Sequence, residues 1–308
     1  MVIKTALFIS LILGSKILGS CAAQAQEAQP DICPRDDSAF ADVQKKASAN
    51  DPVAQTALAS CYDLGLHVQA NGKESIRLLT KAAEKGYAHA EYEIGRIYLY
   101  GRGIPADYAK ALVWETRAAE QGDPRAQRDL AFMYERGFGV PADPAKAAEW
   151  NRKAAGNGNS EAQLQLARAL DQGSGINKNQ HQARQWYAKA AAQDQPEAQL
   201  ELARQLAQKG DCSNAIRWYQ RSAAHGETTA MFELGWLYLE HKCAGDSEKA
   251  LEWFTIGARS GSKECASEVE KLSRSLPAAG RKRAQLAAAK WMKSNPAAEE
   301  DDDAEEKH

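Results

Sequence analysis

Residues 88–123 read AHAEYEIGRIYLYGRGIPADYAKALVWETRAAEQGD, and residues 124–159, PRAQRDLAFMYERGFGVPADPAKAAEWNRKAAGNGN, repeat the same pattern. Alanines, tryptophans and glycines recur at a spacing of 36: Ala54, Ala90, Ala126, Ala162 and Ala198; Trp114, Trp150 and Trp186; Gly86, Gly122 and Gly158. Trp218 and Trp253 follow at spacings of 32 and 35, so one unit is shorter. A period of this length predicts a solenoid in which each unit buries its apolar face against its neighbours.

Each unit carries the start and stop signals of two helices, which we call helix A and helix B. Helix A begins at pairs such as Asp123-Pro124, where a capping side chain precedes a proline in the first helical position. Glycine pairs such as Gly101 and Gly103 predict the turn between the helices. Helix B begins at Asn71, Asp107, Asp143, Asn179, Asp211 and Asp246 and closes at Gly86, Gly122, Gly158, Asp194, Gly226 and Gly261.

These residues resemble the Sel-1-like repeat, a relative of the tetratricopeptide repeat with longer loops. The unit at 87–122 carries Gly95, Tyr98, Gly101, Gly103, Asp107, Lys110, Ala111, Trp114, Ala118, Ala119 and Gly122 of that pattern, and the next carries Asp143, Lys146, Ala147, Trp150, Lys153, Ala154 and Ala155. The resemblance covers residues 51–262. It implies an all-α, α/α solenoid of about six helix-turn-helix repeats that acts as a binding scaffold and not as an enzyme.

The chain divides into five segments. Residues 1–25 combine Lys4, an apolar run and Ala23-Gln24-Ala25, which predicts a secretory signal peptide. Leu18-Gly19-Ser20-Cys21 resembles a lipoprotein motif, so the exported product is either periplasmic or anchored to the membrane through Cys21. We expect an N-terminal segment and capping helix at 26–50, six repeats at 51–262, capping helices at 263–293 and a disordered acidic tail at 294–308.

Composition and motifs exclude several classes of function. The net charge of -2 gives no argument for nucleic-acid binding, and no metal-ligand spacing or cofactor-binding motif is present, so we expect no cofactor and no metal. Ser260-Gly261-Ser262-Lys263 fits the S-x-x-K pattern of penicillin-interacting serine enzymes but lacks its companion motifs. A β-lactam-interacting enzyme is therefore kept only as an alternative.

Binding residues are predicted from the related tetratricopeptide repeat, in which helix A lines the concave wall. One position per repeat holds Ser60, Arg96, Phe132, Arg168, Arg204 and Trp236, and a neighbouring position holds Thr56, Tyr92, Arg128, Leu164, Leu200 and Phe232. From these rows we take Tyr92, Arg96, Arg128, Phe132, Arg168, Arg204, Phe232 and Trp236 as candidate partner-binding residues. Arginine offers forked donors to carboxylates and the aromatic rings offer stacking area, although a solvated helix face would have a similar composition.

The leading hypothesis is an exported scaffold that binds a peptide segment or protein partner in the cell envelope. The resemblance implies roles in envelope assembly, exopolysaccharide export or periplasmic signalling. Besides the β-lactam alternative, direct binding of an acidic glycan would use the same arginines. Trp114, Trp150 and Trp186 are expected to pack in the core.

The cysteines give the most definite geometric expectation. Cys21 is removed or lipidated, which leaves five in the exported chain. Cys33 at the N-terminal capping helix and Cys61 near the end of the following antiparallel helix should be close enough to form a disulfide. Cys212 and Cys243 lie on one edge of the solenoid a repeat apart, and the shortened fifth repeat brings them within reach. Cys265 should remain a buried free thiol.

Overall fold

The computed structural model describes residues 32–240, 243 and 245–298. The predicted signal peptide, Cys21 and residues 299–308 of the acidic tail lie outside the described residues. The described part contains helices and no strands. The helices are α1 (Asp37–Ser48), α2 (Pro52–Leu64), α3 (Gly72–Ala83), α4 (Ala88–Tyr100), α5 (Tyr108–Glu120), α6 (Pro124–Arg136), α7 (Pro144–Gly156), α8 (Ser160–Gln172), α9 (Gln180–Ala192), α10 (Pro196–Gln208), α11 (Cys212–Ala224), α12 (Thr228–Leu239), α13 (Ser247–Arg259), α14 (Lys263–Ser275), α15 (Ala278–Ser294) and the 3-10 turn η1 (Pro296–Ala298).

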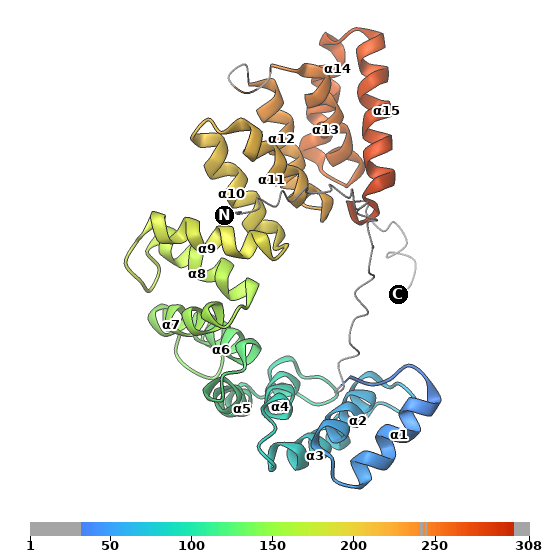
Figure 1. Ribbon diagram of the computed structural model, residues 1–308, viewed down its shortest axis with the longest axis vertical. Coiled ribbons are helices and arrows are strands. Elements are labelled where there is room, and N and C mark those ends of the chain that lie inside the picture. Colours follow the sequence, from blue (N-terminus) through green and yellow to red (C-terminus); the bar gives the residue numbers. More distant parts are fainter. Residues whose placement is uncertain (1–31, 241–242, 244, 299–308) are drawn as a thin grey trace, which may run out of the picture.

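The helices form the predicted α/α solenoid. Helices α2 to α13 make six pairs in which each even-numbered helix is a helix A and each odd-numbered one a helix B. The pairs stack in chain order into a curved superhelix, with α4 and α6 on its inner side and α5 and α7 on its outer side (Figure 1). Helix α1 caps the N-terminal end, and α14 and α15 cap the C-terminal end. No helix in the described ranges is long and apolar enough to span a membrane.

The predicted capping residues begin the helices. The Asp123 side chain accepts hydrogen bonds from the Arg125 and Ala126 amides at the start of α6, and Asp107 accepts one from the Lys110 amide at the start of α5. These bonds satisfy amides that have no partner within the helix. Asp194 stands where other repeats have a glycine and takes the same left-handed backbone conformation, with φ of 60°. The cap positions thus fix where each helix of the repeat begins.

Buried glutamines join successive repeats. The side-chain amide of Gln127 in α6 donates to the carbonyl of Ala119 at the end of α5, 3.0 Å away. Gln55, Gln163 and Gln199 make the equivalent bond at 3.2 to 3.4 Å. Each bond connects a helix A to the preceding helix B, where otherwise unpaired carbonyls end a helix. The same contact therefore recurs in the first, third, fourth and fifth repeats, where it helps to set how the repeat sits on the helix before it.

The loops of the second, third and fourth repeats pack closely on the preceding helix B. Gly175 has φ of 68°, and a Cβ added to it would lie 2.0 Å from the Pro144 carbonyl oxygen at the start of α7. Gly139 approaches the Tyr108 carbonyl at the start of α5 in the same way. Only glycine combines this backbone conformation with so close an approach. The fifth repeat has no such loop, because only residues 209–211 separate α10 from α11.

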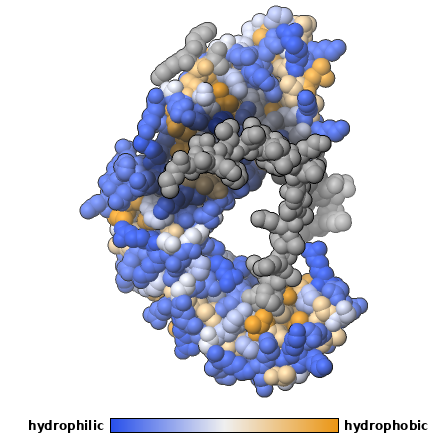
Figure 2. Space-filling model, in the orientation of Figure 1, coloured by the Kyte–Doolittle hydropathy of each residue, from blue (hydrophilic) through white to orange (hydrophobic). Residues whose placement is uncertain are grey.

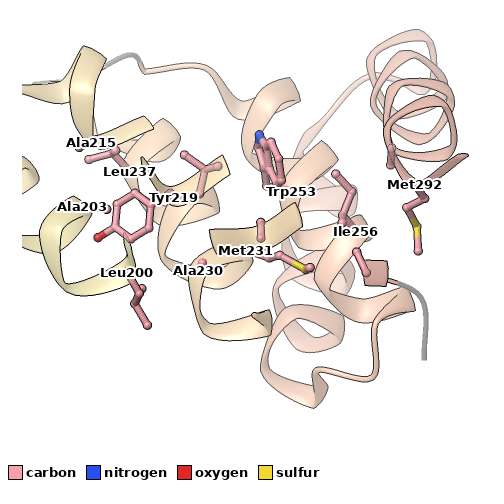
Figure 3. Close-up of a cluster of buried hydrophobic side chains, with 14 residues drawn as sticks. Leu200, Ala203, Ala215, Tyr219, Ala230, Met231, Leu237, Trp253, Ile256 and Met292 are labelled. Atoms are coloured by element: carbon pink, nitrogen blue, oxygen red, sulfur yellow. The ribbon is translucent and has the colours of Figure 1, made fainter. Parts of the chain in front are cut away.

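The structure refines one expectation and departs from two. Trp114, Trp150 and Trp186 pack against the core as expected, but each is only half-buried, and a basic side chain one turn later covers the exposed ring face, as Lys153 does over Trp150 at 3.8 Å. Trp253 is the fully buried member of this row. It lies in the C-terminal core (Figure 3), and Trp291 of α15 packs against it with ring centroids 5.0 Å apart. Residues 294–298, assigned to the tail, belong to the fold: α15 runs to Ser294, and Ala298 packs in the C-terminal core. Cys33 precedes the first helix instead of beginning it.

Candidate functional site

The inner side of the curve is hollowed and bordered mainly by hydrophilic and intermediate residues (Figure 2). The predicted arginine row lies on helices α4, α8 and α10, with each arginine half-buried. Of the neighbouring row, Tyr92, Leu164 and Leu200 are buried and serve the core. Exposure alone therefore does not separate binding residues from structural ones in these rows. The contacts that each side chain makes distinguish the two roles.

Arg204 is fully engaged by other side chains. Its guanidinium donates to both Glu233 carboxylate oxygens at 2.9 Å and also pairs with Glu201. The Tyr219 hydroxyl donates to Glu233 at 3.0 Å. The hydrogen bond to Glu233 raises the pKa of Arg204, which fixes its positive charge. Because its donors are used within the protein, Arg204 contributes to the joint between repeats 5 and 6.

Arg168 is placed differently. It forms no hydrogen bond or ion pair with any described residue, and it lines a groove of about 870 Å³ between α6 and α8. We call this the central groove; its walls include Arg128, Phe132, Arg136, Glu161, Gln165 and Arg168, and its floor on α7 includes Asn151. The volume lies within the range of ligand-binding clefts. An uncompensated guanidinium in such a groove is suited to binding a carboxylate.

The other polar groups of the central groove are partly occupied. Arg128 pairs with Asp129 at 2.8 Å, and the guanidinium of Arg136 lies 5.7 Å from the centroid of the Phe132 ring. Glu161 accepts from Gln165 and Gln195, both at 2.6 Å. Asn151 is 7% exposed, and its side-chain amide makes no hydrogen bond to a described residue. The groove therefore offers the Arg168 guanidinium, which has neither an ion pair nor an aromatic contact among the described residues, together with the free Asn151 amide and the Phe132 ring.

Sequence reasoning missed Asn151 and a buried acidic pair. Asn151 occupies the position after the tryptophan in helix B, where other repeats carry Leu79, Glu115, Tyr187, Tyr219 and Phe254. Glu115 and Asp129 are both fully buried, and burial raises the pKa of each carboxyl group. An alignment of the repeats by this position would have shown that Glu115 and Asn151 are polar where the other repeats carry a leucine, tyrosine or phenylalanine.

The remaining predicted residues lie at the two ends of the inner side. Arg96 and Tyr92 line a separate hollow near the N-terminal end, with the Arg96 guanidinium 5.7 Å from the centroid of the Tyr92 ring. Phe232 and Trp236 lie on α12, where their rings pack edge to face with centroids 6.4 Å apart. Trp236 is 43% exposed and also contacts Phe254. The eight candidate residues thus fall into four groups, at the N-terminal end, in the central groove, at the Arg204 joint and on α12, and do not form one continuous row.

The S-x-x-K segment is used structurally. Ser260 is buried at the end of α13, where its hydroxyl lies within hydrogen-bonding distance of the carbonyls of Ile256 and Ala298. The Ser262 hydroxyl caps α14 by accepting from the Cys265 amide at 3.2 Å. A hydroxyl donor already bound to a carbonyl is not poised as a nucleophile. Among the described residues, no group of three potential ligands could hold a metal ion.

Both predicted disulfides are present. Cys33 is bonded to Cys61, with Cα atoms 4.9 Å apart, and Cys212 to Cys243, with Cα atoms 5.4 Å apart. Cys265 is free and buried, and burial raises the pKa of its thiol. The first bond ties the N-terminal segment to α2, and the second ties the start of α11 to the turn after α12. Two such bonds indicate an oxidising compartment.

Comparison with known proteins identifies the repeat. The model of the Sel1 repeat matches residues 52–87, 88–123, 124–159, 160–195, 196–227 and 228–262. No curated protein matches the chain significantly.

Two solved structures support the same assignment. A protective antigen present in uropathogenic Escherichia coli strains is 29% identical with a TM-score of 0.68; the match covers 83% of this chain but only 55% of that chain. A Sel1 repeat protein from Oxalobacter formigenes is 29% identical with a TM-score of 0.66, covering 75% of this chain and 68% of that one.

Proposed function

This chain belongs to the Sel1 repeat family, and from that premise we propose that it is a non-enzymatic scaffold whose central groove binds an extended segment of a protein partner. Sel1 repeat proteins are generally protein-interaction scaffolds. The observation that carries the proposal is the unpaired Arg168 guanidinium beside the free Asn151 amide and the Phe132 ring. Such a set recognises a carboxylate, a peptide group and an apolar side chain of one extended segment.

We place this activity in the bacterial envelope. The two disulfides support export to an oxidising compartment, and the signal-like residues 1–25 support passage across the inner membrane. Whether the product is free in the periplasm or lipidated at Cys21 decides how far from the membrane the partner is met. A direct role in binding an acidic glycan through the whole arginine row is not proposed, because Glu201 and Glu233 neutralise Arg204.

Site-specific photo-crosslinking tests the proposal. A photoreactive residue at Ala169, which lines the central groove, should capture one partner in cells, and a probe at Val113 on α5, 51% exposed and outside the groove, should not. Arg168→Gln should abolish the capture at Ala169 while leaving helicity and the melting temperature unchanged. Equal capture at both positions, or capture that persists in the Arg168 variant, would place the binding surface elsewhere.

A further inference from the structure

The hollow beside Arg96 is formed by a change of side-chain size in the first repeat. At the two inner-wall positions where later repeats carry arginine or large apolar side chains, this repeat carries Thr56 and Ser60. The result is a hollow of about 460 Å³ between α2, α3 and α4, which we call the N-terminal pocket. It shares no lining residue with the central groove.

Ser75 supplies a buried hydroxyl that the fold does not use. Every other repeat has a buried alanine at this position: Ala111, Ala147, Ala183, Ala215 and Ala250. Ser75 is 1% exposed, lines the pocket, and its hydroxyl has no hydrogen-bond partner among the described residues.

The local backbone does not explain that hydroxyl. A hydroxyl within a helix often donates to the carbonyl four residues earlier, as Thr80 does to Ile76 in the same helix at 2.8 Å. Ser75 makes no such bond, so its hydroxyl is left unpaired in the wall of the pocket. Burial of an unpaired hydroxyl costs free energy. A ligand that forms a hydrogen bond with this hydroxyl would recover that free energy.

Arg96 is the one arginine of the pocket that has no ion pair. Arg102 pairs with Asp63 at 2.6 Å and with Glu93 at 3.1 Å, and Arg125 pairs with Asp123 at 2.9 Å. Arg96 instead lies between two aromatic rings, 5.7 Å from the Tyr92 centroid and 5.5 Å from the Tyr100 centroid.

The carboxyl groups near Arg96 do not replace an ion pair. Asp129, Glu93 and Glu115 act on it only over longer range, and the burial of Asp129 and Glu115 disfavours their charged forms. Arg96 is therefore a cation that is held in place without an ion pair, which suits it to an incoming carboxylate.

The rest of the pocket is aliphatic and firmly held. Ile32 and Leu64 are 49% and 58% exposed at its rim, while Leu79 and Ile97 are buried at its base. The Cys33–Cys61 disulfide fixes the chain beside Ile32 to α2, next to Ser60. A ligand would therefore meet a preformed surface and lose little binding free energy to ordering the protein.

We propose that the N-terminal pocket is a second binding site, separate from the central groove, that takes a carboxylate joined to an aliphatic group: an aliphatic amino acid, either free or as the last residue of a peptide. Arg96 binds the carboxylate, the Ser75 hydroxyl bonds to the polar group next to it, and Leu64, Leu79 and Ile97 contact the aliphatic side chain. The proposal does not depend on the function of the central groove.

Titration of the full chain with N-acetyl-leucine, observed by methyl NMR, tests this site. A ligand of this size, at about 0.3 kcal/mol per heavy atom, binds with a Kd in the low millimolar range, so the titration runs to about 10 mM. We expect shifts at Leu79 and Ile97. N-acetyl-leucinamide, which lacks the carboxylate, should bind about tenfold more weakly or not at all. A tripeptide ending in leucine that binds more tightly identifies a peptide end as the ligand, and equal binding identifies the free acid.

Two variants and a matched control complete the test. Ser75→Ala installs the residue of every other repeat, so it should fold normally while weakening N-acetyl-leucine about two- to tenfold through one lost hydrogen bond. Arg96→Gln should weaken it about tenfold or more, and Arg168→Gln in the central groove should leave it unchanged. Equal binding of the acid and the amide, no binding of either, or wild-type affinity in both pocket variants would overturn the proposal.

Discussion

The inner wall of the solenoid uses the same arginine position in opposite ways in different repeats. In the fifth repeat, Arg204 is held by Glu201 and Glu233, and Tyr219 also donates to Glu233. In the second and fourth repeats, Arg96 and Arg168 have no carboxylate within ion-pair distance. A network whose members satisfy one another stabilises the fold, whereas unpaired groups on a wall are available to a ligand. The difference assigns a structural role to this position in the fifth repeat and a binding role in the second and fourth.

The position after the helix B tryptophan also differs among repeats. Tyr187, Tyr219 and Phe254 fill it in the last three repeats with aromatic rings that pack into the core. In the second repeat it holds Glu115, whose carboxylate oxygens have no hydrogen-bond partner among the described residues. Gly95 leaves room for that side chain, since a Cβ there would lie 2.5 Å from Glu115 Oε1. The second repeat thus gives up stability by burying a polar group behind its binding wall.

The largest effect we expect separates the two ends of the tryptophan row. Trp253→Ala should cost about 3–5 kcal/mol, as large-to-small changes in a core do, because Trp253 is 2% exposed and packs against Trp291. Trp150→Ala should cost about 1–2 kcal/mol, since a half-buried ring loses less contact with the protein. Denaturant unfolding of both variants measures the difference, and equal losses would contradict the contrast in burial.

The close loop contacts of the second to fourth repeats give the next effect. Gly175→Ala should cost about 2–4 kcal/mol, because it combines a left-handed backbone with a steric clash against the Pro144 carbonyl. Gly158→Ala is the matched control: it has φ of 90° but nothing within 4 Å of the added Cβ, so only the backbone term of about 1–2 kcal/mol applies. Thermal unfolding compares the two. Similar losses would show that the loop does not pack on α7 in solution.

A smaller effect, opposite in sign, is expected at the buried acid. Glu115→Leu, which copies Leu79 of the first repeat, should stabilise the chain at pH 7 by about 1–2 kcal/mol, because it removes a buried carboxyl group that has no hydrogen-bond partner among the described residues. Glu149→Leu on the next helix B, with the side chain 61% exposed, is the control and should change little. A destabilised Glu115→Leu protein would indicate that Glu115 has a partner that this account omits.

Glu115 should also make the stability of the protein depend on pH. Burial raises the pKa of Glu115 in the folded state above its ordinary value of 4.5, so folding takes up a proton where the unfolded carboxyl is ionised. Stability should therefore rise as pH falls from 7 toward 5, and this contribution is lost as pH rises through the folded pKa. In Glu115→Leu the dependence of stability on pH should be weaker. It should not disappear, because burial also raises the pKa of Asp129, Glu91 and Asp63.

Much of the fold follows from spacing alone. The 36-residue period, the capping aspartates and the glycine pairs determine the helices, and repeat geometry brought both pairs of cysteines together. These features are local or are repeated, so one sequence is enough to find them. The candidate site was harder to predict, because it depends on which side chains each arginine pairs with.

The arginines show where that limit lies. Arg168 has Gln165 three residues earlier, whereas Arg204 has Glu201 at that distance, a difference that is visible in the sequence. Arg96 has Glu93 there, yet Glu93 pairs with Arg102 from the following loop. The second contact of Arg204, with Glu233, comes from the next repeat. Contacts across repeats depend on side-chain conformation, which the repeat pattern does not specify.

The measurement that tests the central claim most directly compares Arg168→Gln with Arg204→Gln in one assay. Each variant is unfolded in denaturant and titrated with the partner segment identified by crosslinking at Ala169. Arg204→Gln should lose about 1.5–3 kcal/mol of stability by breaking hydrogen bonds to charged groups, and should bind the segment as the wild type does. Arg168→Gln should keep its stability and lose about tenfold or more in affinity. The reverse pattern, or equal losses of affinity in both variants, would contradict the assignment of a structural role to the arginine of the fifth repeat and a binding role to the arginine of the fourth.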